Sequence, residues 1–180
     1  MKSYIEDPYK NGIFTLPIKI NSLTTEEFKE VFLNTKIIAY GFSGISPYWR
    51  TFQVASGFLL YFNNDKIVEF NSLITGIPNT WDEYGSLRVA VHDSMSSLEH
   101  PDLTIEKYEI EPVKVTSIHK LIFQDKEMLI DCGIVFSNNE NYEIKIAAAS
   151  ASMCATVQAP FSTGKFEPDT SEKLFKRVVL

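Results

Sequence analysis

Two histidines and two carboxylates lie close together near the middle of the chain. His92-Asp93 and Glu99-His100 bracket a short polar loop. Imidazole nitrogens and carboxylate oxygens bind zinc and other divalent metals, so these four residues have the right chemistry for a metal site. Ligands from one segment normally converge on a helix or a tight turn, and a pair that follows an expected strand lacks that geometry. We therefore expect solvated loop residues, no metal and no cofactor, and keep a metal-dependent enzyme as an alternative.

A second possible chemistry is that of a cysteine nucleophile. Asp131-Cys132 could supply a thiolate if His92 or His119 acted as the base that ionises it. Adjacent residues on a strand point to opposite faces, however, so Asp131 is badly placed to assist Cys132. Cys132 and Cys154 both lie in apolar runs, where a free thiol behaves as a small hydrophobe. The sequence therefore predicts two reduced core cysteines and no catalytic residue.

The acidic residues of the chain are concentrated between residues 82 and 111. This segment has eight acidic residues against only Arg88 and Lys107, and the surplus equals the formal net charge of the whole chain, −6. Charge gathered in one segment attracts a basic protein surface, and aromatic residues beside loops make good interface anchors. The predicted partner-binding residues are Asp82, Glu83, Asp93, Glu99, Asp102, Glu106, Glu109, Glu111, Trp49, Trp81 and Tyr84.

Composition limits the class of protein. The 180 residues suit a single domain over 1–180, and 44% apolar with 13% aromatic residues can fill its core. A pI near 5.1 disfavours nucleic acid as a partner, because binding phosphates needs clustered Lys and Arg. The N-terminus lacks the apolar run of a secretory signal, and no stretch has the roughly 20 apolar residues of a membrane span. We expect a cytoplasmic protein that binds no membrane.

The pattern of apolar residues predicts one clear helix and several strands. Thr24 and Glu27 have the spacing of a capping box, and Phe28, Val31 and Phe32 form the apolar face of a helix that ends near Asn34. Alternation and turn signals indicate strands elsewhere, with polar turns at 63–65 and 137–141 that suit antiparallel hairpins. The expected strands are 36–42, 52–62, 66–74, 86–91, 103–110, 113–123, 129–136 and 142–149.

These elements favour an α+β domain built on a mainly antiparallel sheet, either a sandwich or a half-barrel. The N-terminal helix packs on the sheet. Residues 170–176 suit a short C-terminal helix, and a final strand at 178–180 is the alternative. A small, acidic, cytoplasmic domain without catalytic motifs resembles bacterial immunity proteins in its profile. That resemblance implies a non-catalytic protein that neutralises a cationic toxin domain by direct binding. A small-ligand carrier with an apolar cavity in its sheet is the other alternative.

Overall fold

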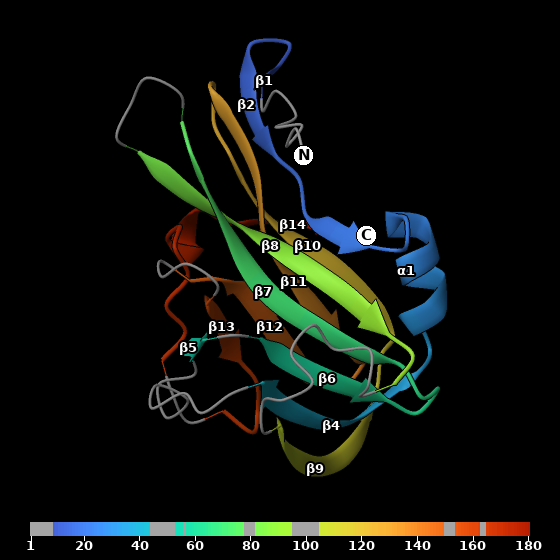
Figure 1. Ribbon diagram of the computed structural model, residues 1–180. Helices are drawn as coiled ribbons and strands as arrows, with labels where there is room; N and C mark the ends of the chain where they lie inside the picture. Colours follow the sequence, from blue (N-terminus) through green and yellow to red (C-terminus); the bar gives the residue numbers. More distant parts are fainter. Residues whose placement is uncertain are drawn as a thin grey trace, which may run out of the picture.

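The computed structural model describes residues 9–43, 53–55, 57–77, 82–94, 105–149, 154–162 and 165–180. Within these ranges the chain is mainly β, with two mixed, mostly antiparallel sheets, one short N-terminal helix and a C-terminal 3-10 turn (Figure 1). The fold class expected from the sequence is therefore confirmed. At the C-terminus the helical part is a single turn, Glu172–Leu174, and the chain then continues as a strand.

One sheet has six strands in the order β3-β8-β7-β6-β4-β9. β3 and β8 run parallel, and the other neighbours run antiparallel. The long β7–β8 hairpin pairs from Ile67 with His92 at one end to Gly76 with Glu83 at the other. The strands are β3 (Lys19–Asn21), β4 (Lys36–Ser43), β6 (Phe58–Phe62), β7 (Ile67–Gly76), β8 (Glu83–His92) and β9 (Ile105–Lys114).

The other sheet has eight strands, with β11 at its centre. β10 and β12 pair with β11 antiparallel, and β2 pairs with it parallel. β13 and β5 continue the sheet beyond β12, and β14 lies beside β10. The strands are β1 (Tyr9–Lys10), β2 (Ile13–Leu16), β5 (Gln53–Ala55), β10 (Ser117–Gln124), β11 (Met128–Ser137), β12 (Glu143–Ala148), β13 (Cys154–Gln158) and β14 (Lys176–Val179).

The main hydrophobic core is built from both sheets. Figure 1 shows β7 and β8 crossing in front of β11, β12 and β13, and buried side chains of both groups belong to one cluster. Phe70 of β7 and Phe136 of β11 have ring centroids 6.0 Å apart. An aromatic side chain buries about 150–250 Å², so such contacts join the two layers. The largest fully buried side chains of this cluster are Phe28, Phe32, Phe58, Phe62, Phe70, Phe136, Ile37, Leu60, Leu87 and Ile118.

The helix α1 (Thr25–Phe32) begins with the capping box that the sequence predicts. The Glu27 main-chain N–H donates to the Thr24 hydroxyl at 3.2 Å, and the Thr24 N–H donates to a Glu27 carboxylate oxygen at 2.7 Å. Phe28 and Phe32 are buried, and their ring centroids lie 6.3 Å from Phe136 and 4.5 Å from Phe62 respectively. The helix therefore packs its apolar face against strands of both sheets.

The expected hairpin between 129–136 and 142–149 is confirmed by the pairing of β11 with β12. Regular alternation along this strand would place Ile130, Cys132, Ile134 and Phe136 on one face, and here the structure differs. Ile134 and Phe136 belong to the main core, whereas Ile130 and Cys132 belong to a second cluster with β2. The pairing of β10 with β11 shifts register just after Leu121, and such a bulge redirects the side chains that follow it.

Two predicted strand boundaries are wrong. The expected strand 52–62 is two strands, because β5 pairs with β13 in the eight-stranded sheet and β6 pairs in the six-stranded one. Gly57 lies between them with φ 123°, a conformation that favours glycine. The expected break at Glu111-Pro112 is also absent, because β9 continues to Lys114. Proline is tolerated there since β9 is an edge strand of its sheet.

The C-terminal segment, residues 165–180, contacts both sheets. The Asp169 main-chain N–H donates to the Ala148 carbonyl at 2.9 Å, and its carboxylate accepts from the Gly85 N–H at 2.8 Å. Further on, Phe175 packs against the second cluster, which contains Cys132. β14 then pairs antiparallel with β10. The segment thus links β8 of one sheet to β10 and β12 of the other.

Candidate partner-binding surface

β9 carries three exposed carboxylates and is the last described strand of the six-stranded sheet. Glu106, Glu109 and Glu111 are all exposed, and β9 is the last strand of the sheet order, beyond β4. Within the described ranges, no salt bridge involves any of the three. We call Glu106, Glu109, Glu111 and the intervening Tyr108 the acidic edge.

Tyr108 connects the acidic edge to the aromatic residues behind it. Its side chain is 36% exposed, and its hydroxyl donates to a Glu106 carboxylate oxygen at 2.6 Å. This hydrogen bond, helped by burial and by the negative charge of Glu106, raises the pKa of Tyr108, because ionisation would place two negative oxygens together. The phenol therefore stays neutral and acts as a donor that orients Glu106.

A stack of aromatic rings supports Tyr108. The Tyr40 ring of β4 lies 5.2 Å from the Tyr108 ring at 19° and 4.2 Å from the Phe161 ring at 6°. Phe161 follows β13 of the eight-stranded sheet, so the stack joins the two sheets beside the acidic edge. Offset parallel rings attract each other beyond their buried area. The stack therefore holds Tyr108 on a rigid base, and none of its three rings is among the predicted partner-binding residues.

Lys107 points to the opposite face of β9 from Glu106 and Tyr108. Its ammonium nitrogen lies 4.8 Å from the centroid of the Tyr61 ring of β6, so the charge sits over an aromatic face. A hollow of about 320 Å³ lies beside this pair and has both apolar and charged residues in its lining. The lining consists of Ile38, Tyr61, Phe62, Asp65, Lys66, Ile67, Ser94, Ile105 and Lys107.

The structure separates the ends of the acidic segment. Asp82 and Glu83 are exposed at the start of β8, and β7, β6 and β4 lie between β8 and β9 in the sheet. In Figure 1 this end of β8 is at the upper left, whereas β9 is at the bottom. Tyr84 is half-buried, with its ring centroid 6.5 Å from that of Phe14. Residues 82–84 and the acidic edge are therefore two separate surfaces.

Asp93 lies at the opposite end of β8 and already has a cationic partner. Its carboxylate accepts a short hydrogen bond from the Lys66 ammonium group. That hydrogen bond and the charge of Lys66 hold the pKa of Asp93 below its usual value. The remaining predicted partner-binding residues, Glu99, Asp102, Trp49 and Trp81, lie outside the described residues.

His92 is buried, contrary to the prediction of a solvated loop residue. It ends β8 with 7% exposure, and its Nε2 lies 3.0 Å from a carboxylate oxygen of Glu69, which is 5% exposed on the neighbouring β7. Burial tends to raise the pKa of Glu69, but hydrogen bonds from His92 and Asn71 and the charges of His92 and Arg88 outweigh it, so this pKa is lowered. Glu69 is a single acidic residue between the apolar Val68 and Phe70. A carboxylate within an apolar run is the sequence signal that could have indicated a buried partner such as His92.

Only two of the four residues of the metal-site alternative lie among the described residues. His92 points to Glu69 and Asp93 points to Lys66, while Glu99 and His100 lie outside the described residues. Among the residues that are described, no three His, Cys, Asp or Glu side chains are grouped so that they could hold a metal ion.

Cys132 is a buried thiol, in agreement with its predicted core position. Burial is the main cause that raises its pKa to about 11, against hydrogen bonds that involve Thr170 and Phe123. Asp131 does not serve the thiol. Its carboxylate accepts from the Lys120 ammonium group at 2.8 Å and from the Ile18 main-chain N–H at 2.9 Å.

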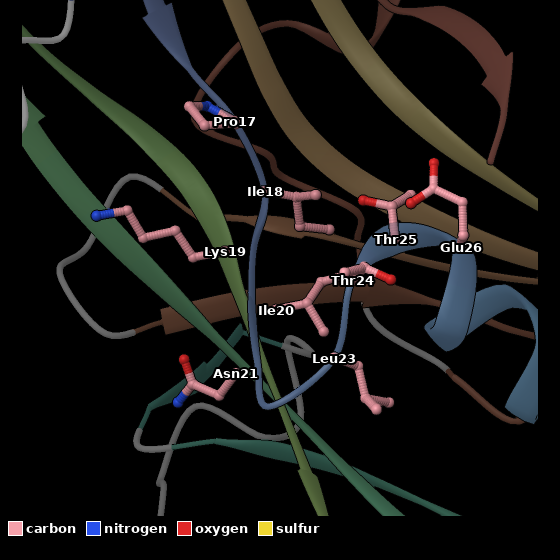
Figure 2. A pocket seen from close by; sticks show the side chains of 9 residues that line it. All are labelled: Pro17, Ile18, Lys19, Ile20, Asn21, Leu23, Thr24, Thr25 and Glu26. Atoms are coloured by element: carbon pink, nitrogen blue, oxygen red, sulfur yellow. The ribbon is translucent and has the colours of Figure 1, made fainter.

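A larger hollow, of about 580 Å³, lies between β3 and the start of α1. Figure 2 shows Lys19 pointing to one side of the chain and Ile18 to the other, with Thr25 and Glu26 across the hollow. One continuous stretch, residues 17–26, provides the described lining, and none of the predicted partner-binding residues belongs to it.

Comparison of the chain with protein-family models, with curated proteins and with solved structures finds no match. Within the ranges that the structure covers, no helix is both long and apolar enough to cross a membrane.

Proposed function

We propose that this chain is a non-catalytic binding domain that docks a basic protein partner on the acidic edge of β9. The observation that carries the proposal is the set of three exposed carboxylates, Glu106, Glu109 and Glu111, on the last described strand of the six-stranded sheet. By its profile the domain is a bacterial immunity protein, which acts in the cytoplasm and neutralises a cationic toxin domain by covering its working surface.

The acidic edge has the features that fast and specific docking requires. Exposed carboxylates of one sign speed the encounter with a basic surface, and the attraction weakens as salt screens it. Tyr108 adds an aromatic anchor of a type that is enriched at interfaces. Its ring is already fixed against Tyr40, so little side-chain entropy is lost when a partner binds.

The test is charge reversal at the acidic edge. The triple variant Glu106→Lys, Glu109→Lys, Glu111→Lys is compared with a matched control, Glu30→Lys, Glu127→Lys, Glu140→Lys, whose three carboxylates are also exposed but lie elsewhere. The wild-type chain captures its partner from the native host at low salt, and mass spectrometry identifies it. Calorimetry with the purified partner then gives the affinities.

We expect the β9 triple variant to bind at least about 100-fold more weakly, because three contacts become repulsive, while the control loses much less. Co-expression with a toxic partner should restore growth for the wild type and the control only. Equal affinity of the two triple variants at low and high salt would remove β9 as the docking surface. If circular dichroism shows both variants folded, the comparison reports on binding alone.

A further inference from the structure

β9 also leaves one side of its main chain open. Among the described strands it pairs with β4 alone, and the side chains of Glu106, Lys107, Tyr108 and Glu109 are exposed, so no other described strand covers this stretch. An uncovered edge strand has unpaired N–H and C=O groups that can accept a further strand.

The orientation of the β9 main chain can be read from a close contact. A Cβ atom on Gly41 of β4 would stand 2.6 Å from the Glu106 carbonyl oxygen, so this carbonyl points toward β4. Main-chain groups alternate along an antiparallel strand. The N–H and C=O groups of Lys107 and Glu109 therefore point to the open side.

The charges along this stretch are complementary to themselves. If a second β9 runs antiparallel with Tyr108 opposite Tyr108, each Lys107 stands opposite a Glu109 of the other copy. Opposite charges that face each other across a strand pair are stabilising, and like charges are destabilising. Shifts of two residues, which keep the same main-chain groups on the shared edge, place Lys107 opposite Lys107 or Glu109 opposite Glu109. The register centred on Tyr108 therefore avoids the repulsion that both shifts create.

We propose that two copies of this chain form a symmetric dimer by antiparallel pairing of β9 around Tyr108. Lys107 and Glu109 of each copy make the cross-strand main-chain and charge contacts, and the two six-stranded sheets become one continuous sheet. This pairing is isologous, so it closes at two copies instead of growing into a fibre.

The dimer is short and therefore weak. The register of β9 with β4 is regular from Ile105 to Glu109, but residues 110–112 have no partner in β4, and Pro112 lacks an N–H. Each Lys107 also has to leave the Tyr61 ring to reach its partner. These features restrict the new pairing to a few residues, fewer than a stable interface normally buries.

This inference goes beyond the proposed function, and its test uses only this chain. Both processes use Glu109, so a basic partner and a second copy compete for β9. Partner binding is measured with calorimetry against a second protein, whereas the dimer is measured with the isolated chain. A negative result for the dimer therefore does not contradict partner binding, and a negative result for partner binding does not contradict the dimer.

Sedimentation equilibrium of the isolated chain, from about 10 μM to 1 mM, measures the dimer. We expect a concentration-dependent monomer–dimer equilibrium for the wild type. Lys107→Glu and Glu109→Lys should each weaken it about tenfold or more, because each places like charges opposite one another twice in a symmetric pair. The combined variant, Lys107→Glu with Glu109→Lys, should dimerise as the wild type does. Lys126→Glu, at an exposed position outside β9, serves as the control.

The two single variants distinguish dimerisation through this β9 register from dimerisation that depends only on the net charge of the chain. Glu109→Lys makes the acidic chain less negative and would strengthen a dimer limited only by overall repulsion, whereas the β9 register predicts that it weakens the dimer. An equimolar mixture of the two single variants should form heterodimers, because both facing pairs then carry opposite charges. A wild type that stays monomeric to about 1 mM, or a combined variant that does not recover, would overturn the proposal.

Discussion

The Glu69 carboxylate receives hydrogen bonds that only the folded chain brings to it. His92 of β8 lies 3.0 Å from one of its oxygens, and the Asn71 side chain donates to the other at 3.1 Å. Burial alone would raise the pKa of this group, but these donors and the charge of Arg88 lower it. The group therefore makes the folded state sensitive to acid.

The sign of that sensitivity follows from the lowered pKa. Glu69 contributes stability above its unfolded pKa of about 4.3, and this stability is lost as the pH falls through the lower folded value. We predict that the urea midpoint of the wild type falls toward that of Glu69→Gln between about pH 5 and pH 3. Urea unfolding at several pH values measures this. The exposed Glu140→Gln variant should follow the wild type, and parallel profiles for Glu69→Gln and the wild type would contradict the expected linkage.

The sequence predicts the environment of a residue only where neighbours in the sequence determine it. His92 follows an alternating strand and looks like the start of a loop, because its partner Glu69 lies 23 residues away and becomes its neighbour only through the β7–β8 pairing. The raised pKa of Cys132, in contrast, agrees with its predicted core position, since an apolar run is a local signal of burial. Tyr108 gains its role from Tyr40 and Phe161, and no local pattern indicates that stack.

At the scale of single elements, α1 is a helix whose start is determined by residues that are close together in the sequence. The capping box uses residues only three apart, so its two hydrogen bonds are visible in the spacing of Thr24 and Glu27. The capping contacts also lower the pKa of Glu27, chiefly through the hydrogen bond from the Thr24 main chain. The helix then buries Phe28 and Phe32 in the main core.

We predict that Thr24→Ala lowers the free energy of unfolding by about 0.5–2 kcal/mol, because the Glu27 N–H loses its side-chain acceptor. Thr24→Ser keeps the hydroxyl and should stay within about 0.5 kcal/mol of the wild type. Chemical denaturation monitored by circular dichroism gives both values. Equal stability of the alanine and serine variants would mean that the cap hydrogen bond contributes nothing measurable.

Strands were predictable where their partners are close in the sequence. The β6–β7 and β11–β12 hairpins have polar turns between apolar runs, and both are present. β5 and β9 differ from expectation because their limits depend on distant strands. β5 pairs with β13, roughly 100 residues later in the chain, and Pro112 is accommodated only because β9 lies at the edge of its sheet.

At the scale of the whole molecule, the main core contains buried side chains from both sheets. Ile144 of β12 is fully buried in the same cluster as Val89 of β8. The sequence predicts the β-rich class from composition and alternation, but it does not assign strands to sheets, because that depends on contacts between distant residues. The prediction of one domain over 1–180 therefore remains to be tested by unfolding.

We predict a single unfolding transition in which far-UV and near-UV circular dichroism coincide. Ile144→Ala should shift both signals together and cost about 2–5 kcal/mol, whereas Ile144→Val should cost about 0.5–1.5 kcal/mol. Val89→Ala, on the other sheet, should likewise move both signals. Two separable transitions, with each variant affecting one of them, would mean that the sheets unfold independently.

The position of the C-terminal segment in the chain determines when its contacts can form during synthesis. A ribosome makes residues 165–180 after every strand that they contact, yet Asp169 links Gly85 to Ala148, and Phe175 packs on the cluster that contains Cys132. Until these residues emerge, the hydrogen bonds of Asp169 and the packing of Phe175 on that cluster are missing. These contacts between the two sheets can therefore form only at the last step of synthesis.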